Sequence, residues 1–318
     1  MEETRKKITI VLPSFNEEEN IEGIYNTLNN LFNEKLIKYD YDYLFIDNHS
    51  KDNTREIIRN LSKKDKHIKA IFNAKNFGQF NSPFYAMIHT ISDATILMAT
   101  DFQDPIDLIP TFVKEWEDGY KICAAQKKKS NENAFLLFFK KIYYSLIKKF
   151  SNVDQIPMFT GFGLYDKEFI NILKDLNDPT PFLRGIVAEY GYKVKIIPYT
   201  QGKRKNGKTS NNFLSLYDAA MLSFTSYTKM GLRIATFFGF ICSMLSLLIG
   251  IIYLIMKLIW WDRFPAGTIP MLLGMLFLGS IQIFFIGLLG EYILSMNQRI
   301  MNRPLVIEEE RINFTDEI

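Results

Sequence analysis

Short apolar segments alternate with amphipathic segments along the first third of the chain. Apolar runs rich in β-branched and aromatic residues predict buried strands at residues 8–12, 41–46, 68–72 and 94–99. Between them, apolar positions at helical spacing follow polar turn residues. This pattern predicts three helices, one that ends near residue 32 and two that span residues 55–61 and 82–91. Strands that alternate with helices predict a parallel, doubly wound α/β sheet.

Polar side chains follow two of these predicted strands. Asp47 comes directly after the second strand, and Asp101 and Gln103 come after the fourth, which Pro105 prevents from continuing. Ligands of open α/β sheets bind at the carboxyl ends of the strands, where carboxylate and amide oxygens suit a hard divalent cation and its phosphates. The alternative is a solvated acidic turn that caps a helix beginning near Asp107.

Two long uncharged segments occupy the last third of the chain, at residues 234–256 and 264–290. Each is longer than the roughly 20 residues that cross a hydrocarbon core, so we expect two transmembrane helices. The basic residues outside this pair predict a multi-pass protein of the inner or plasma membrane with both termini and the N-terminal domain in the cytoplasm. These flanking residues are Lys229, Arg233, Arg299 and Arg303.

Two further segments have aromatic and aliphatic side chains at helical spacing. They cover residues 135–150, with lysines beside the apolar face, and residues 213–224, just before the first uncharged segment. Both are predicted to lie at a membrane surface and to make the lipid bilayer a partner of the chain. For the first segment, packing against its own domain is an equal alternative.

Composition and charge narrow the function classes. The chain has 318 residues, of which 47% are hydrophobic and 23% charged, and its formal net charge is only +3. This balance does not indicate nucleic acid as a partner. The two cysteines, Cys123 and Cys242, lie in different parts of the chain, which argues against a disulfide framework and fits a reducing compartment.

Seven short motifs together resemble the family 2 glycosyltransferases with a GT-A fold, and among them the bacterial polyprenyl-phosphate sugar transferases related to dolichol-phosphate mannose synthase. The resemblance covers nearly the whole chain. The motifs are residues 11–21, Asp47-Asn48-His49-Ser50 with Asp52 and Thr54, Asn76-Phe77-Gly78, Asp101-Phe102-Gln103-Asp104-Pro105, residues 204–210, residues 287–292 and Asn302-Arg303-Pro304-Leu305.

This resemblance implies a domain organisation. A mixed, doubly wound GT-A sheet with helices on both faces is expected in a cytosolic catalytic domain at residues 1–210. An interfacial amphipathic helix at residues 211–231 and two transmembrane helices within residues 232–296 are expected to follow. Residues 297–318 are then a cytosolic tail. Small residues in the helices permit close packing, within one subunit or in a homo-oligomer.

The resemblance also implies roles for individual residues. The nucleotide sugar is expected to contact Pro13, Phe15, Glu17, Asp47, Asn76, Lys203, Arg204 and Lys208. Asp101 and Gln103 are expected to hold Mg²⁺ or Mn²⁺ at the diphosphate. Asp101, Asp104 and Arg204 are the expected catalytic residues, with helix capping as the alternative for Asp104.

The activity implied is inverting transfer of a sugar from a nucleotide donor, most simply a UDP-sugar, to polyprenyl (undecaprenyl) phosphate for cell-envelope glycan or O-antigen modification. A phosphate acceptor is already largely anionic at neutral pH, so it needs no general base. The chain departs from the family pattern at Ala99, Gly161 and Ser210. A catalytically silent membrane scaffold, or a transferase with another lipid or glycan acceptor, therefore remains an alternative.

Overall fold

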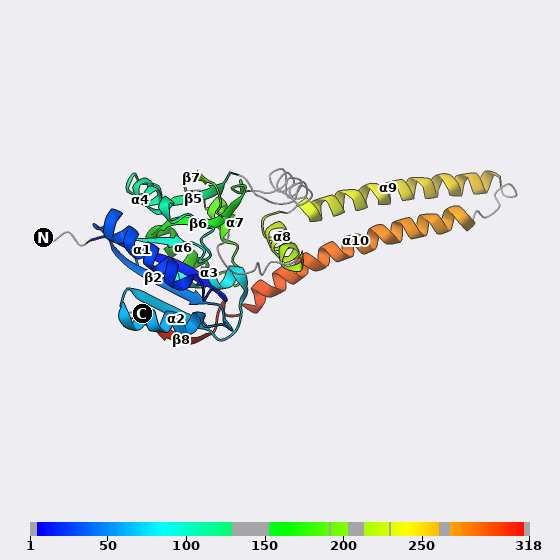
Figure 1. The fold of residues 1–318 in the computed structure, drawn as a ribbon. Coiled ribbons are helices and arrows are strands. Elements are labelled where there is room, and N and C mark those ends of the chain that lie inside the picture. Colours follow the sequence, from blue (N-terminus) through cyan, green and yellow to red (C-terminus); the bar gives the residue numbers. More distant parts are fainter. Residues whose placement is uncertain are drawn as a thin grey trace.

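An eight-stranded mixed sheet forms the centre of an N-terminal domain, and two long helices project from it as a hairpin (Figure 1). The computed structural model describes residues 5–128, 153–190, 192–202, 213–228, 230–260 and 268–314. The predicted helix at residues 135–150 lies outside these ranges.

The strands and helices follow one another in the predicted alternation for the first third of the chain. The strands are β1 (Lys7–Ser14), β2 (Asp40–Asp47), β3 (Ile68–Asn73), β4 (Ala94–Leu97), β5 (Ile122–Lys127), β6 (Phe159–Asp166), β7 (Val194–Tyr199) and β8 (Glu308–Ile312). The helices are α1 (Ile21–Lys35), α2 (Thr54–Lys64), α3 (Gly78–Ile88), the 3₁₀ turn η1 (Ile106–Leu108), α4 (Ile109–Glu117), α6 (Lys167–Leu176), α7 (Leu183–Glu189), α8 (Phe213–Tyr227), α9 (Met230–Ile259) and α10 (Thr268–Met301).

The strand order is β7-β5-β6-β4-β1-β2-β3-β8. The pairs of β1 with β2, β1 with β4 and β2 with β3 are parallel, whereas β6 and β8 run antiparallel to their neighbours. The prediction of a mixed α/β sheet is confirmed. The strands β5 to β8 were not predicted individually.

Apolar side chains on successive strand positions point to opposite faces of the sheet. Ile10 and Leu12 of β1 lie in an apolar cluster with residues of α1, α2 and α4. Val11 between them belongs to a second cluster with residues of α3, α6 and α7. Helices therefore cover both faces, which explains why the inner strands are continuously apolar in sequence.

The register of the parallel strands brings the predicted site residues to one edge. Ser14 at the end of β1 pairs with Asp47 at the end of β2, and Val11 pairs with Leu97 at the end of β4. The turns after β1, β2 and β4 consequently lie next to one another. This confirms the prediction that Asp47 and Asp101 share one end of the sheet.

The hairpin of α9 and α10 is apolar on surfaces that face away from the protein. The side chains of Phe237 and Ile283 are 71% and 72% exposed, a degree of exposure that suits lipid and not water. Phe238 and Phe285 contact each other between the helices, with ring centroids 6.0 Å apart. Among the described residues, one segment is long and apolar enough to cross a membrane, Phe277–Met301, and Leu232–Cys242 is a shorter apolar segment. The hairpin is thus a membrane-associated element.

The helix α10 extends beyond the second predicted span. Residues 264–290 are expected to cross the membrane, and α10 continues without interruption to Met301. Its last part carries Glu291 and Arg299, which bond to α8: the Tyr217 hydroxyl donates to Glu291 Oε1 at 3.0 Å, and Arg299 Nη2 donates to Ser226 Oγ at 3.1 Å. The C-terminal part of α10 is therefore apolar over much of its surface and also contacts α8.

The segment after α10 returns to the sheet. Residues of β8 pair antiparallel with β3, with Ala70 opposite Ile312 and Phe72 opposite Glu310. From its sequence this segment is expected to be a tail and not a strand, because Glu-Glu-Glu-Arg-Ile is poor in residues that favour strands. Charged side chains are nonetheless typical of a strand at the edge of a sheet.

One close approach inside the sheet can be tested. A Cβ added at Gly163 of β6 would lie 2.3 Å from the carbonyl oxygen of Cys123 on β5. Gly163→Ala should therefore lower the free energy of unfolding by about 1–3 kcal/mol, because the backbones of β5 and β6 would have to separate. Urea unfolding of the purified protein in detergent measures this change.

The matched control is Gly23→Ala in α1, where the nearest atom to the new Cβ is the Cζ of Phe102 at 3.4 Å. Alanine favours a helix over glycine by about 1 kcal/mol, so this variant should be neutral or stabilised. Equal losses in both variants would contradict the close contact at Gly163.

Candidate functional site

A large cavity opens at the edge of the sheet where the predicted site residues meet. Its volume is about 1630 Å³, and it is bounded by the turns after β1, β3 and β4 and by the helices α8 and α10. The predicted residues that line it are Pro13, Phe15, Glu17, Asn76, Asp101 and Gln103. One space thus connects the turns of the sheet with the base of the membrane hairpin.

The side-chain amide of Asn48 joins the turn after β2, the second turn, to the turn after β3, the third turn. Both its nitrogen and its oxygen make two hydrogen bonds. Its Nδ2 donates to Asn76 Oδ1 at 2.9 Å and to the Gly78 carbonyl at 3.2 Å. Its Oδ1 accepts from the Phe77 backbone N–H at 2.8 Å and from Asn73 Nδ2 at 3.1 Å. The predicted residue Asn76 is therefore held in place by Asn48, a residue of the second motif for which the sequence alone predicts no separate role.

The first turn is fastened to the second by side chains of the Ser-x-Asp-x-Thr motif. Ser50 Oγ accepts from the backbone N–H of Asn16 at 2.8 Å, and Thr54 Oγ1 accepts from that of Glu17 at 2.8 Å. Asn16 has a left-handed backbone with φ 55°, which asparagine tolerates better than most residues. These bonds fix the backbone at Phe15 and Glu17 on the cavity wall.

Asp47 is fully buried below the second turn. Its Oδ2 accepts from the backbone N–H groups of His49 and Ser50, each at 3.1 Å, and from Arg55 Nε at 2.5 Å. Its other oxygen, Oδ1, is buried and has no hydrogen-bond partner in the described part of the chain. A buried acceptor of this kind is costly unless a ligand or water satisfies it.

The turn that follows β4 is tied to the segment that leads into the basic loop. Gln103 donates its backbone N–H to Asp101 Oδ1 at 3.1 Å. The Gln103 carbonyl accepts from the Gly202 N–H at 3.2 Å, and Gln103 Oε1 accepts from Gln201 Nε2 at 2.9 Å. Phe102, which lies between Asp101 and Gln103, has a left-handed backbone with φ 60°. The start of the basic loop is therefore held against Asp101 and Gln103.

The oxygens of this turn fit a hard divalent cation. Asp101 is 5% exposed and borders the cavity together with Gln103. No group of three or more His, Cys, Asp or Glu side chains suited to a metal occurs among the residues the structure describes. Mg²⁺ is commonly held by one or two protein oxygens while substrate phosphates and water complete its shell, so one carboxylate and one amide suffice.

Asp104 is a buried carboxylate whose two oxygens both accept hydrogen bonds. Oδ2 accepts from the Ala99 backbone N–H at 3.0 Å and Oδ1 from the Tyr199 hydroxyl at 3.1 Å. Burial raises the pKa of Asp104, and these two donors only partly offset that effect. In this arrangement Asp104 links β4 to the end of β7 and holds the turn in shape.

The remaining predicted residues, Lys203, Arg204 and Lys208, lie outside the described residues. The same segment has the Gly-x-x-x-x-Gly-Lys-Thr spacing of a P-loop from Gly202 to Thr209, so the expectation from sequence that the chain has no Gly-Lys-Ser/Thr pair was wrong. A P-loop joins an inner strand to a helix, whereas β7 is the edge strand of this sheet. The spacing alone therefore assigns no phosphate site.

A smaller cavity of about 300 Å³ adjoins the turn on the side of β6. Gly161, one of the departures from the family pattern, lines it together with Asp104. Two cationic residues that received no role from the sequence, Lys127 and Arg184, also border it. They stand at the end of β5 and in α7, far apart in sequence, and only the fold brings them together.

The role of Asn48 predicts the effect of an isosteric change. Asn48→Asp removes both donor bonds to the third turn and places a charge beside two acceptor oxygens, so the free energy of unfolding should fall by about 1–3 kcal/mol. Hydrogen exchange followed by mass spectrometry should show faster exchange at residues 76–78. Asn30→Asp, the same change at an exposed position of α1, should leave both quantities unchanged.

The Tyr199–Asp104 bond can be tested through its pH dependence. The Tyr199 hydroxyl lowers the pKa of Asp104 against the raising effect of burial. Tyr199→Phe should therefore cost about 1–3 kcal/mol of unfolding free energy at neutral pH, and the loss should shrink as acid protonates Asp104 in both proteins. Tyr192→Phe, whose ring packs on Phe169, should show no such pH-dependent loss.

Comparison with known proteins identifies the family of this chain. Residues 9–191 match the family described as Glycosyl transferase family 2, and residues 232–296 match the GtrB C-terminal hairpin. The first match covers more than half of the chain. It covers the strands β1 to β6 and the turns between them, and the second match coincides with α9 and most of α10.

Curated relatives match along nearly their whole length. The chain is 30% identical to the putative glycosyltransferase CsbB of Bacillus subtilis, over 95% of this chain and 91% of that protein. It is 31% identical to the prophage bactoprenol glucosyl transferase homolog of Escherichia coli, over 90% of this chain and 93% of that protein. The bactoprenol glucosyl transferase of Shigella phage SfX is 30% identical, over 96% of this chain and 99% of that protein.

Among solved structures, Staphylococcus aureus TarS 1–349 in complex with UDP-GlcNAc gives a TM-score of 0.47 at 16% identity, over 69% of this chain and 66% of that chain. So remote a likeness adds nothing to the family match. The match over residues 9–191, the hairpin match and the full-length relatives agree with the observed sheet and helices. The chain therefore belongs to glycosyltransferase family 2 and is a hexosyltransferase-type enzyme with a GtrB C-terminal hairpin.

Proposed function

We propose that this enzyme transfers glucose, with inversion, from a UDP-sugar to polyprenyl (undecaprenyl) phosphate in the modification of cell-envelope glycan or O-antigen. The observation that carries the proposal is the cavity that extends from the interlocked turns to α8 and α10. Because α10 belongs to the membrane hairpin, the same space is open to a nucleotide sugar from the sheet side and to a lipid head group from the membrane side. Relatives named bactoprenol glucosyl transferases support the sugar and the acceptor.

The nucleotide is proposed to bind at the first three turns. Pro13, Phe15, Glu17 and Asn76 line the cavity there. Asp47 Oδ1 is a buried acceptor at the end of β2, beside Ser14 of β1, and a base N–H or ribose hydroxyl is proposed to satisfy it. A carboxylate that accepts such a bond gives a charge-assisted interaction, stronger than a neutral acceptor provides.

The diphosphate is proposed to lie over the Asp101–Gln103 turn. Mg²⁺ or Mn²⁺ bound to these two residues would supply positive charge that stabilises the leaving nucleoside diphosphate. Lys203, Arg204 and Lys208 follow the tethered residues Gln201 and Gly202 and are proposed to bring further positive charge to the phosphates. Arg204 is for this reason retained as a catalytic residue.

Direct displacement accounts for the chemistry without a general base. An anionic oxygen of the lipid phosphate forms a bond to the anomeric carbon, while the bond from that carbon to the diphosphate oxygen breaks and the nucleoside diphosphate leaves. The protein has to hold two anions close together, which is a matter of positioning and charge. Asp104 is proposed to contribute indirectly. It keeps the turn after β4 in shape, and this turn then orients the acceptor as it approaches.

The orientation in the membrane is proposed from charge. Arg233 near the start of α9 and Arg299 and Arg303 near the end of α10 lie at the domain end of the hairpin. The positive-inside tendency then places the catalytic domain and both termini in the cytoplasm. A cytoplasmic catalytic domain has direct access to nucleotide sugars.

The purified full-length protein in detergent, with Mg²⁺, polyprenyl phosphate and a panel of nucleotide sugars, tests this proposal. We expect release of UDP and a glucosyl lipid detectable by mass spectrometry. Asp101→Asn should lower kcat by at least about 100-fold, because the metal ion would be held less tightly and its positive charge at the diphosphate would be lost. Removal of divalent cations with EDTA should have a comparable effect.

Asp107→Asn is the matched control, since Asp107 is an exposed acid six residues further along the chain and should tolerate the change. UDP release without a lipid product would point to another acceptor. Absence of turnover across the whole panel, with the protein folded, would favour a catalytically silent scaffold.

A further inference from the structure

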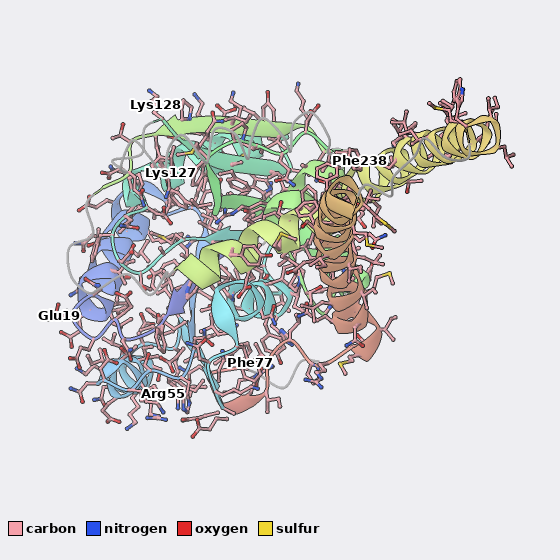
Figure 2. All side chains as sticks on the ribbon, turned by 90° about the vertical axis from the view of Figure 1, so that its right-hand side faces the viewer. Glu19, Arg55, Phe77, Lys127, Lys128 and Phe238 are labelled. Atoms are coloured by element: carbon pink, nitrogen blue, oxygen red, sulfur yellow. The ribbon has the colours of Figure 1, made fainter. Side chains whose placement is uncertain are left out.

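Arg55 connects three elements that are distant in sequence. Its guanidinium donates from Nε to Asp47 Oδ2 at 2.5 Å, from Nη1 to Glu309 Oε2 at 2.8 Å, and from Nη2 to the Asn73 carbonyl at 2.5 Å. Arg55 stands in the first turn of α2, at the lower edge of the domain in Figure 2. Each nitrogen of the planar group thus has its own acceptor, on β2, β8 and β3.

Asp47 depends on this arrangement more than on any other side chain. It is fully buried, and Arg55 is the one cation paired with it among the described residues. The other donors to Asp47 Oδ2 are the backbone N–H groups of His49 and Ser50, which form the turn beside the nucleotide cavity. A shift of the Asp47 carboxylate would therefore move both its unsatisfied Oδ1 and this turn.

Glu309 reaches Arg55 only because the chain returns to the sheet after the membrane hairpin. The two residues are separated by 254 positions in sequence. The Arg55 side chain is 14% exposed and that of Glu309 is 53% exposed, so the ion pair lies at the rim of a largely buried network. Pairing of β8 with β3 fixes the backbone that presents Glu309.

We propose that Arg55 is a positioning residue for the nucleotide donor, and that the C-terminal strand β8 orients Arg55 through Glu309. The segment beyond the membrane hairpin thereby takes part in shaping the nucleotide site. This inference rests on the proposed function insofar as the ligand is a nucleotide sugar. Its structural content, that Glu309 and Arg55 hold the Asp47 turn, does not depend on the sugar or the acceptor.

The chain supplies a matched control on the same strand. Glu310, next to Glu309, pairs with Arg59 of α2 at 2.6 Å. Arg59 stacks over the Phe72 ring, 4.7 Å from its centroid, and among the described residues its ion pairs are with Glu56 and Glu310 and not with Asp47. Glu310→Gln and Glu309→Gln thus remove the same charge from adjacent residues, each paired with an arginine of α2, and only Glu309 connects to Asp47.

The experiment compares Arg55→Lys, Glu309→Gln and Glu310→Gln in the full-length protein. Lysine keeps the charge but cannot reach three acceptors at once, so Arg55→Lys should raise the Kd for UDP about tenfold. Glu309→Gln removes one partly exposed pair and should raise the Kd about threefold, whereas Glu310→Gln should change it by less than about 1.5-fold. Isothermal titration with UDP measures these constants without requiring turnover.

Hydrogen exchange of residues 47–54, measured without nucleotide, is the second readout. Exchange there should accelerate in Arg55→Lys and Glu309→Gln and remain at the wild-type rate in Glu310→Gln. If Glu310→Gln weakens UDP binding and loosens this turn as much as Glu309→Gln, or if no variant alters either quantity, the inference is overturned. A wild-type protein that does not bind UDP would refute the proposed donor, and the exchange rates would still decide the role of Glu309 and Arg55.

Discussion

The amide of Asn48 is the constraint on which the geometry of the site depends. Its four hydrogen bonds join the turns after β2 and β3, and the side chains of Ser50 and Thr54 join the turn after β1 to the same segment. The turns have no strand pairing of their own, so side-chain bonds of this kind must replace it. The cavity therefore has a defined wall on its nucleotide side.

Two buried aspartates hold this wall by different means. Asp47 is paired with a cation, Arg55, in addition to backbone N–H groups. Asp104 accepts hydrogen bonds from two neutral donors, the Ala99 N–H and the Tyr199 hydroxyl, and burial raises its pKa although these donors and the charge of Lys127 oppose it.

The membrane hairpin is connected to the catalytic domain on both sides. Before it, α8 contacts α10 through Tyr217 and Glu291, and Arg299 reaches Asp178 at 3.4 Å. After it, β8 completes the sheet beside β3, so both ends of the hairpin return to the domain (Figure 1). The cavity is consequently held at a fixed position relative to α10, as a reaction between a soluble donor and a lipid requires.

The sequence by itself determined the inner strands, the hairpin and the location of the turns, because each depends on local patterns: continuous apolar runs, long uncharged segments, and polar residues directly after a strand. Only the tertiary structure decided that residues 308–312 form an edge strand, that Tyr199 bonds Asp104, and that Arg55 bridges Asp47 and Glu309. The sequence around Arg55 predicts only an ordinary helix residue, and Glu309 lies 254 positions away from it. No local pattern encodes such a pair, since its energy arises only when folding buries the charges beside each other.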